Sequence, residues 1–197
     1  ADHRYHHYLE ALESPDINYI SVKISGIYAQ THALNYEESF PELVSRMSAL
    51  YQKAIDFPYT DEDGIKRSKF INLDMEEYKD AHFTLRLFKA VLNLPQFKNY
   101  SAGIVVQAYL PDAYDFQTEL LEFAKARIDG GGVPIKMRLV KGCNLEMETV
   151  ISSLKGWPNP IRPSKTEVDA ISGLLLIICS RSLMLICWLR STGQPDI

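Results

Sequence analysis

The sequence predicts an α/β fold built around a parallel sheet, and two observations lead to this prediction. Up to Ala170, apolar runs of strand length alternate with longer segments of helical periodicity four times, at intervals of roughly 30–50 residues. The strand candidates are continuous apolar runs, as expected when helices cover a sheet. An open doubly wound sheet and part of a (β/α)8 barrel both satisfy this pattern.

The predicted strands are short runs rich in β-branched and other apolar residues, and they cover residues 19–25, 70–73, 102–108 and 135–140. The predicted helices carry apolar residues at gaps of three and four, and they cover residues 37–55, 77–93, 116–127 and 145–154. Pro95 ends the second of these helices, because proline cannot continue the helical hydrogen bonds. A polar turn is expected over residues 57–66, and the glycines at 130–132 are expected to cap the third helix.

The composition and charge of the chain argue against nucleic-acid binding, attraction to anionic membranes and metal binding. The 197 residues favour one domain, and a net charge of -4 gives no general attraction to nucleic acid or to an anionic membrane. The three cysteines show no metal-type spacing. The cluster of His3, His6 and His7 lacks a cysteine or acidic partner at ligand spacing, so no metal site is expected.

Polar side chains stand late on all four predicted strands, namely Lys23, Asp74, Gln107, Arg138 and Lys141. In both parallel architectures ligands bind at the C-terminal ends of the strands, so these side chains are expected at one rim. Burying them unpaired costs several kcal/mol each. The plainer alternative is that some are exposed loop residues or form a structural ion pair such as Lys23 with Asp74. The excess of cations favours an anionic ligand, phosphate or carboxylate.

The chain changes character after Ala170. Residues 171–197 hold a long apolar run and two of the three cysteines, with no acidic residue before Asp196. They lack both the polar face of an amphipathic helix and the alternation of a half-buried strand. We therefore expect a partial enzyme domain over residues 1–170 and an aberrant apolar tail over residues 171–197.

Five segments resemble, in order and spacing, the proline dehydrogenase domain of the bifunctional proline utilization A family: YISVKISGI, FINLDMEEYKD, GIVVQAYLPDA, MRLVKGCNLEME and PSKTEVDA. The resemblance covers residues 2–170. That family folds as a (β/α)8 barrel holding FAD, so the resemblance implies a partial barrel here, with about four β/α units.

The resemblance also implies a reaction. L-proline is oxidised by hydride transfer to flavin N5, giving Δ1-pyrroline-5-carboxylate, and the electrons pass to a membrane quinone. Lys23 matches the lysine that pairs with the proline carboxylate, and Asp74 matches the aspartate beside it. Gln107 matches a glutamine at the flavin ring, Arg138 the arginine near N5, and Lys141 the lysine at the FAD phosphates. A cytoplasmic location is implied, with peripheral association at the inner membrane face.

The chain departs from the family pattern in two places. Cys143, Asn144 and Leu145 stand where many members have Ala-Tyr-Trp. After Ala170 the family continues as Asn-Tyr-Lys-Arg-Leu. The codons TAT AAG CGG CTT for Tyr-Lys-Arg-Leu, read one base later, give Ile-Ser-Gly-Leu, the residues found here from Ile171. The tail is therefore interpreted as a frame-shifted reading. A membrane helix is the alternative, although Arg181 in mid-segment would cost about 2.5–3.5 kcal/mol.

Two further functional hypotheses stay open from the residues alone. The chain could belong to another barrel enzyme, such as a lyase that uses Lys23 or Lys141 as a Schiff base. It could also be a non-functional truncated product, because half a barrel exposes sheet edges and apolar surface. Under the dehydrogenase hypothesis, the isolated fragment is expected to be inactive.

Overall fold

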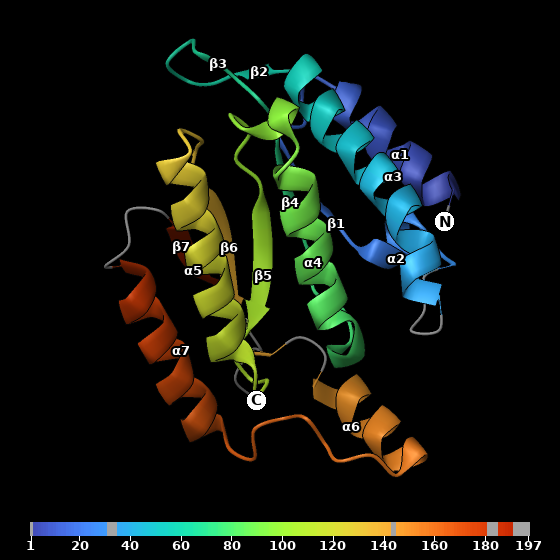
Figure 1. The fold of residues 1–197 in the computed structure, drawn as a ribbon, viewed down its shortest axis with the longest axis vertical. Coiled ribbons are helices and arrows are strands. Elements are labelled where there is room, and N and C mark those ends of the chain that lie inside the picture. Colours follow the sequence, from blue (N-terminus) through green and yellow to red (C-terminus); the bar gives the residue numbers. More distant parts are fainter. Residues whose placement is uncertain (1, 31–34, 143–144, 181–184, 191–197) are drawn as a thin grey trace. The chain divides into compact units, whose positions relative to one another are not determined.

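The computed structural model describes residues 2–30, 35–142, 145–180 and 185–190. The chain folds as two compact units, unit 1 (Ala1–Ile104 with Gly131–Val133) and unit 2 (Val105–Gly130 with Pro134–Ile197). Strand β5 (Gly103–Gln107) gives its first two residues to unit 1 and the rest to unit 2. Figure 1 labels the elements of both units along the chain.

Unit 1 contains three parallel strands in the order β1, β4, β5. β1 (Tyr19–Val22) pairs over its whole length with β4 (Phe70–Leu73). Asn72 of β4 lies beside Gly103 of β5. The helical segments of unit 1 are α1 (Asp2–Glu13), α2 (Ile24–Ile27), α3 (Tyr36–Asp56), α4 (Ala81–Leu92) and the single turns η2 (Tyr78–Asp80) and η3 (Pro95–Phe97).

The core of unit 1 follows the helical periodicity of the sequence. Leu43, Met47 and Leu50 of α3 are fully buried, at the gaps of four and three that place them on one face. The long helices α1 and α3 lie side by side, as Figure 1 shows, and α3 also packs against α4. The predicted helix over residues 37–55 is thus confirmed, with one residue more at each end.

Unit 2 contains the end of β5, then β6 (Ile135–Val140) and β7 (Leu185–Arg190), all parallel. Its helices are α5 (Ala113–Asp129), α6 (Leu145–Lys155) and α7 (Lys165–Ser180). The C-cap of α5 is Gly130, and Gly131 has a φ of +77°, the left-handed region that glycine enters without strain. The glycines therefore end the helix as predicted.

Three predicted elements differ from the structure. The first strand ends at Val22 rather than at residue 25, because the Lys23 carbonyl accepts hydrogen bonds from the N–H groups of Gly26 (2.9 Å) and Ile27 (3.1 Å) and so starts the turn α2. The helix expected over residues 77–93 begins as η2 and becomes α-helical at Ala81. The polar turn over residues 57–66 contains β2 (Tyr59–Thr60), which forms a small antiparallel hairpin with β3 (Lys66–Arg67).

Helix α7 runs through Ala170 without interruption. Ser172, Leu175 and Cys179 are buried at gaps of three and four, so residues 171–180 bury one helical face that sequence periodicity did not indicate. The proposed change of reading frame after Ala170 concerns the origin of these residues and stays a prediction. In the described ranges, no helix is long and apolar enough to cross a membrane.

Candidate active site

Lys23 and Asp74 lie at the C-terminal ends of neighbouring strands in unit 1. The N–H of Asp74 donates to the carbonyl of Val22 at 2.8 Å, which extends the β1–β4 pairing by one step. Lys23 follows Val22 directly and is exposed, whereas Asp74 is partly buried. The structure therefore brings these two predicted site residues to the same end of the strands.

Asp74 is held from within β4. The Nδ2 atom of Asn72 donates to Oδ1 of Asp74 at 2.6 Å, and the Ser21 hydroxyl reaches the same oxygen at 3.5 Å. Asn72 is only 1% exposed. A Cβ at Gly103, beside Asn72, would stand 2.8 Å from its Oδ1 atom, so a glycine at this position makes room for the amide. Sequence reasoning missed Asn72, although a polar residue in the apolar run FINLD was a signal.

Lys23 is mounted on the four-residue turn α2. Glu76 accepts two hydrogen bonds from Ser25, one from its backbone N–H at 3.0 Å and one from its hydroxyl at 2.7 Å. Tyr8 of α1 packs beside this turn, and burial is the main cause that raises the pKa of its phenol. Gly26 has no room for a side chain, since a Cβ there would stand 2.7 Å from the Tyr8 hydroxyl oxygen.

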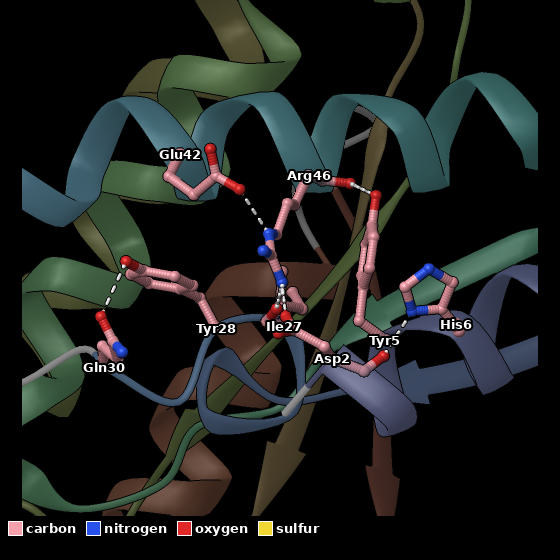
Figure 2. Close-up of polar contacts among 8 residues, drawn as sticks. All are labelled: Asp2, Tyr5, His6, Ile27, Tyr28, Gln30, Glu42 and Arg46. Carbon is pink, nitrogen blue, oxygen red and sulfur yellow. Dashed lines mark hydrogen bonds and ion pairs between the residues drawn. The ribbon is translucent and has the colours of Figure 1, made fainter.

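The other end of α2 is held by Arg46 of α3, as Figure 2 shows. Its Nη1 atom donates to the Ile27 carbonyl at 3.1 Å and to Oδ1 of Asp2 at 2.6 Å, while Nε donates to Glu42 at 2.6 Å. The guanidinium carbon lies 5.1 Å from the ring centroids of both Tyr5 and Tyr28. Hydrogen bonds to Asp2 and Glu42 raise the pKa of Arg46, and the hydrogen bond from Arg46 lowers the pKa of Asp2.

In unit 2, Gln107 is the last residue of β5, and Arg138 lies in β6 two residues before its end at Val140. The N–H of Ala108 donates to the Val140 carbonyl at 2.9 Å, so the C-terminal ends of the two strands are adjacent. Gln107 is 2% exposed and Arg138 8% exposed, within strands that are otherwise almost wholly apolar and buried. Burying a guanidinium and an amide costs free energy unless each is hydrogen-bonded, and that these two side chains serve a site stays a prediction.

Tyr109 and Arg162 hold the segment around Gln107 through hydrogen bonds. The Nε2 atom of Gln107 donates to the Tyr109 hydroxyl at 2.7 Å. The backbone N–H of Arg162 donates to the Tyr109 carbonyl at 2.9 Å, and its guanidinium donates to the Pro111 carbonyl at 3.1 Å. The proline-rich segment before α7 is thereby tied to the loop after β5. The roles of Tyr109 and Arg162 were not inferred from sequence spacing.

Lys141 follows β6 by one residue and forms an ion pair with Asp169 of α7. Its Nζ atom lies 2.6 Å from Oδ1 of Asp169, and both side chains are partly exposed. The hydrogen bond from Lys141 lowers the pKa of Asp169, helped by the charge of Lys165. The sequence placed Lys141 at a ligand phosphate and gave no sign of this carboxylate, which stands 28 residues away.

The structure thus groups the predicted site residues in two sets. Lys23 and Asp74 share a strand end in unit 1, and Gln107, Arg138 and Lys141 share one in unit 2. That all five surround a single ligand stays a prediction. The structure describes no cluster of three or more His, Cys, Asp or Glu side chains suited to a metal ion.

Comparison with known proteins identifies the family. The family model described as proline dehydrogenase matches residues 1–171. The chain belongs to the proline dehydrogenase family. No curated protein matches it significantly.

Solved proline utilization A structures show the same fold. The protein from Corynebacterium freiburgense is 32% identical, with a TM-score of 0.80 over 98% of this chain and 22% of its own. The protein from Bdellovibrio bacteriovorus, solved after inactivation by N-propargylglycine, is 30% identical, with a TM-score of 0.81 over 96% of this chain and 21% of its own. A Bradyrhizobium japonicum homologue at 19% identity shares the fold, with a TM-score of 0.79.

These matches confirm the predicted fold class, α/β with part of a barrel, and the predicted resemblance. The chain spans about a fifth of the length of these proline utilization A proteins. Within the family motif RLVKG, Arg138 and Lys141 are placed as described above, whereas the departures at Cys143 and Asn144 lie outside the described residues.

Proposed function

We propose that this chain provides part of the substrate and cofactor site of a proline dehydrogenase, which oxidises L-proline to Δ1-pyrroline-5-carboxylate with FAD and passes the electrons to a membrane quinone. The observation that supports this most is Arg138. This residue is 8% exposed within β6, two residues before the strand end that lies next to the end of β5 with Gln107. A member of this family would use a fixed cation there to stabilise negative charge that develops during the reaction.

On the substrate side, Lys23 is the proposed partner of the proline carboxylate. It is exposed at the end of β1, and an ammonium forms strong charge-assisted hydrogen bonds with a carboxylate. Asp74 stands at the neighbouring strand end with its carboxylate fixed by Asn72. In this arrangement Asp74 places a negative charge near Lys23, and its carboxylate is already engaged by the Asn72 amide.

The side chains of unit 2 fit FAD by the chemistry of their donor groups. An amide, a guanidinium and an ammonium, from Gln107, Arg138 and Lys141, are hydrogen-bond donors suited to ring carbonyls and phosphates. FAD, when bound, supplies the electron-accepting ring. Tyr109 orients the amide of Gln107 through the 2.7 Å hydrogen bond. Asp169 holds the Lys141 ammonium, whose remaining two N–H donors would be free for phosphate oxygens.

The lyase alternative is less well supported. A Schiff-base lysine needs its side-chain nitrogen free to attack a carbonyl, and Nζ of Lys141 is engaged by Asp169 at 2.6 Å. Family membership also favours the dehydrogenase. The proposed location is the cytoplasm, with peripheral association at the inner membrane face where the quinone lies.

The 197-residue chain by itself is proposed to be inactive. The family clamps the proline carboxylate with a second cationic group, an Arg-Arg pair, and the chain contains no such pair. Losing charge-assisted hydrogen bonds of this kind costs on the order of 2–5 kcal/mol. The hypothesis that this chain is a non-functional truncated product is therefore compatible with its place in the proline dehydrogenase family.

A chimaera tests the proposal. Residues 1–170 would replace the matching segment of the Corynebacterium freiburgense protein, and proline-dependent reduction of a quinone analogue would be measured beside the 197-residue chain. We expect activity in the chimaera, its loss after treatment with N-propargylglycine, and none in the chain alone. A folded chimaera that binds FAD but does not oxidise proline, while the parent does, would contradict the proposed function.

A further inference from the structure

The turn α2 is too short to hold its own position. It has four residues, and its hydrogen bonds include those from the N–H groups of Gly26 and Ile27 to the Lys23 carbonyl. An isolated helical turn of this length is unstable in water because nucleation costs more than a few hydrogen bonds return. Contacts from other elements must therefore fix the backbone of Lys23.

Two charged side chains supply these contacts, one at each end of the turn. Glu76, from the loop after β4, accepts both hydrogen bonds of Ser25, which satisfies a backbone N–H that the first turn of a helix leaves without a partner. Arg46, from α3, donates to the Ile27 carbonyl, one of the groups that the last turn leaves open. Neither side chain belongs to α2, and they come from different elements.

The side chain of Arg46, which contacts the C-terminal end of α2, is itself held in place. Figure 2 shows its guanidinium between the rings of Tyr5 and Tyr28, with Asp2 and Glu42 as acidic partners. The side chain of Arg46 is 20% exposed. Cation–π contacts of a largely desolvated arginine, together with two charged hydrogen bonds, hold the planar group in one orientation.

We infer that Glu76 and Arg46 are positioning residues for Lys23, which fix the turn α2 from its two ends and so set where the Lys23 ammonium stands. This inference rests on the proposed function for its meaning, since Lys23 is the proposed partner of the proline carboxylate. Neither residue is expected to touch substrate. The negative charge of Glu76 is not itself required, because a glutamine can accept from the Ser25 N–H and donate to its hydroxyl.

The experiment is amide hydrogen exchange, followed by NMR, on the 197-residue chain and its variants. The amides of Gly26 and Ile27 report directly on the Lys23 carbonyl. In Glu76→Ala their protection should fall by roughly 10- to 100-fold, as expected when two hydrogen bonds to a carboxylate are lost, while the core amide of Val106 keeps its protection. Glu76→Gln should restore most of the protection. Arg46→Met should lower protection at Ile27.

Glu77→Ala is the matched control, since this neighbour pairs with Lys79 outside α2 and should leave the amides of Gly26 and Ile27 unchanged. The inference is overturned if Glu76→Ala leaves both amides protected, if it lowers protection equally throughout the chain, or if Glu76→Gln behaves like Glu76→Ala.

The chimaera that carries residues 1–170 separates this inference from the proposed function. Lys23→Met in that chimaera should raise the L-proline concentration needed for half-maximal flavin reduction. If that concentration does not change while the exchange results are as expected, the positioning role stands and the role of Lys23 toward substrate fails.

Discussion

Asn72 donates a hydrogen bond from Nδ2 to Oδ1 of Asp74 at 2.6 Å, from a position in β4 that is almost fully buried. Residues two apart on an extended chain project to the same face, so the amide and the carboxylate meet without distortion. The aspartate that sequence reasoning placed at the site thus depends on a neighbour inside the strand.

Asn72→Ala should destabilise unit 1 by about 1–3 kcal/mol, because the Asp74 carboxylate loses a charged hydrogen bond and a buried side chain is removed. Urea unfolding would measure this. Asn72→Asp places a second carboxylate beside Asp74, so its destabilisation should be larger at neutral pH than at acidic pH. The exposed Asn99→Ala is the control, and equal effects at positions 72 and 99 would contradict the role of Asn72.

Two glycine substitutions should change stability in opposite directions. A Cβ at Gly103 would stand 2.5 Å from Cζ of Phe70 and 2.8 Å from Oδ1 of Asn72, so Gly103→Ala should destabilise by about 1–3 kcal/mol through overpacking. A Cβ at Gly173, inside α7, meets nothing within 4 Å, so Gly173→Ala should stabilise by about 0.5–1 kcal/mol. Urea midpoints that move in the same direction would show that one of these local descriptions is incorrect.

The Lys141–Asp169 ion pair predicts an acid-dependent contact. The pKa of Asp169 is lowered in the folded chain, so the pair stabilises the folded state above the ordinary carboxyl value of 3.8 and is lost as the pH falls through the lowered folded value. An NMR titration of the Asp169 carboxyl carbon would give its pKa. Lys141→Met should return that pKa toward its ordinary value, and Glu167 serves as an internal reference. An unchanged Asp169 pKa in this variant would exclude the pair.

The contacts of Arg46 predict that a positive charge alone does not give the stability that arginine gives at this position. Arg46→Lys keeps the positive charge but loses the planar fork that bonds Glu42, Asp2 and Ile27 and stacks between two rings, so most of the effect of Arg46→Ala, about 1–2 kcal/mol, should remain. Thermal unfolding of both variants would measure this. If Arg46→Lys were as stable as the unaltered chain, charge pairing alone would account for the contribution of Arg46.

The sequence predicted the buried strands well and the local turns poorly. β4 and β6 agree with the predicted residues at both ends, because each is a short, mainly apolar run followed at once by a charged residue. The end of the first strand was misplaced, since the turn at Lys23 depends on Glu76 and Arg46, which lie far along the chain. The β2–β3 hairpin was missed because two-residue strands leave no pattern of their own.

Sequence reasoning was also limited at the candidate site, where some contacts join residues far apart in the chain. Lys23, Asp74, Gln107, Arg138 and Lys141 could be proposed from sequence because polar residues late on apolar strands have no packing reason to be there, and their role in a site stays a prediction. Glu76 and Asp169 could not, because each acts through a partner that only the fold brings near, whereas Asn72 and Tyr109 were missed although their partners stand two residues away. Asp169, for example, reaches Lys141 across 28 residues.

The most direct test of the central claim is the rate of flavin reduction in the chimaera that carries residues 1–170. After anaerobic mixing with L-proline in a stopped-flow instrument, the loss of oxidised-flavin absorbance should be fast in the chimaera. It should be slower by about 100-fold or more in the same protein with Arg138→Met, as expected when a preorganised charge is removed. FAD content should change far less. An unchanged reduction rate in Arg138→Met would contradict the site proposed here.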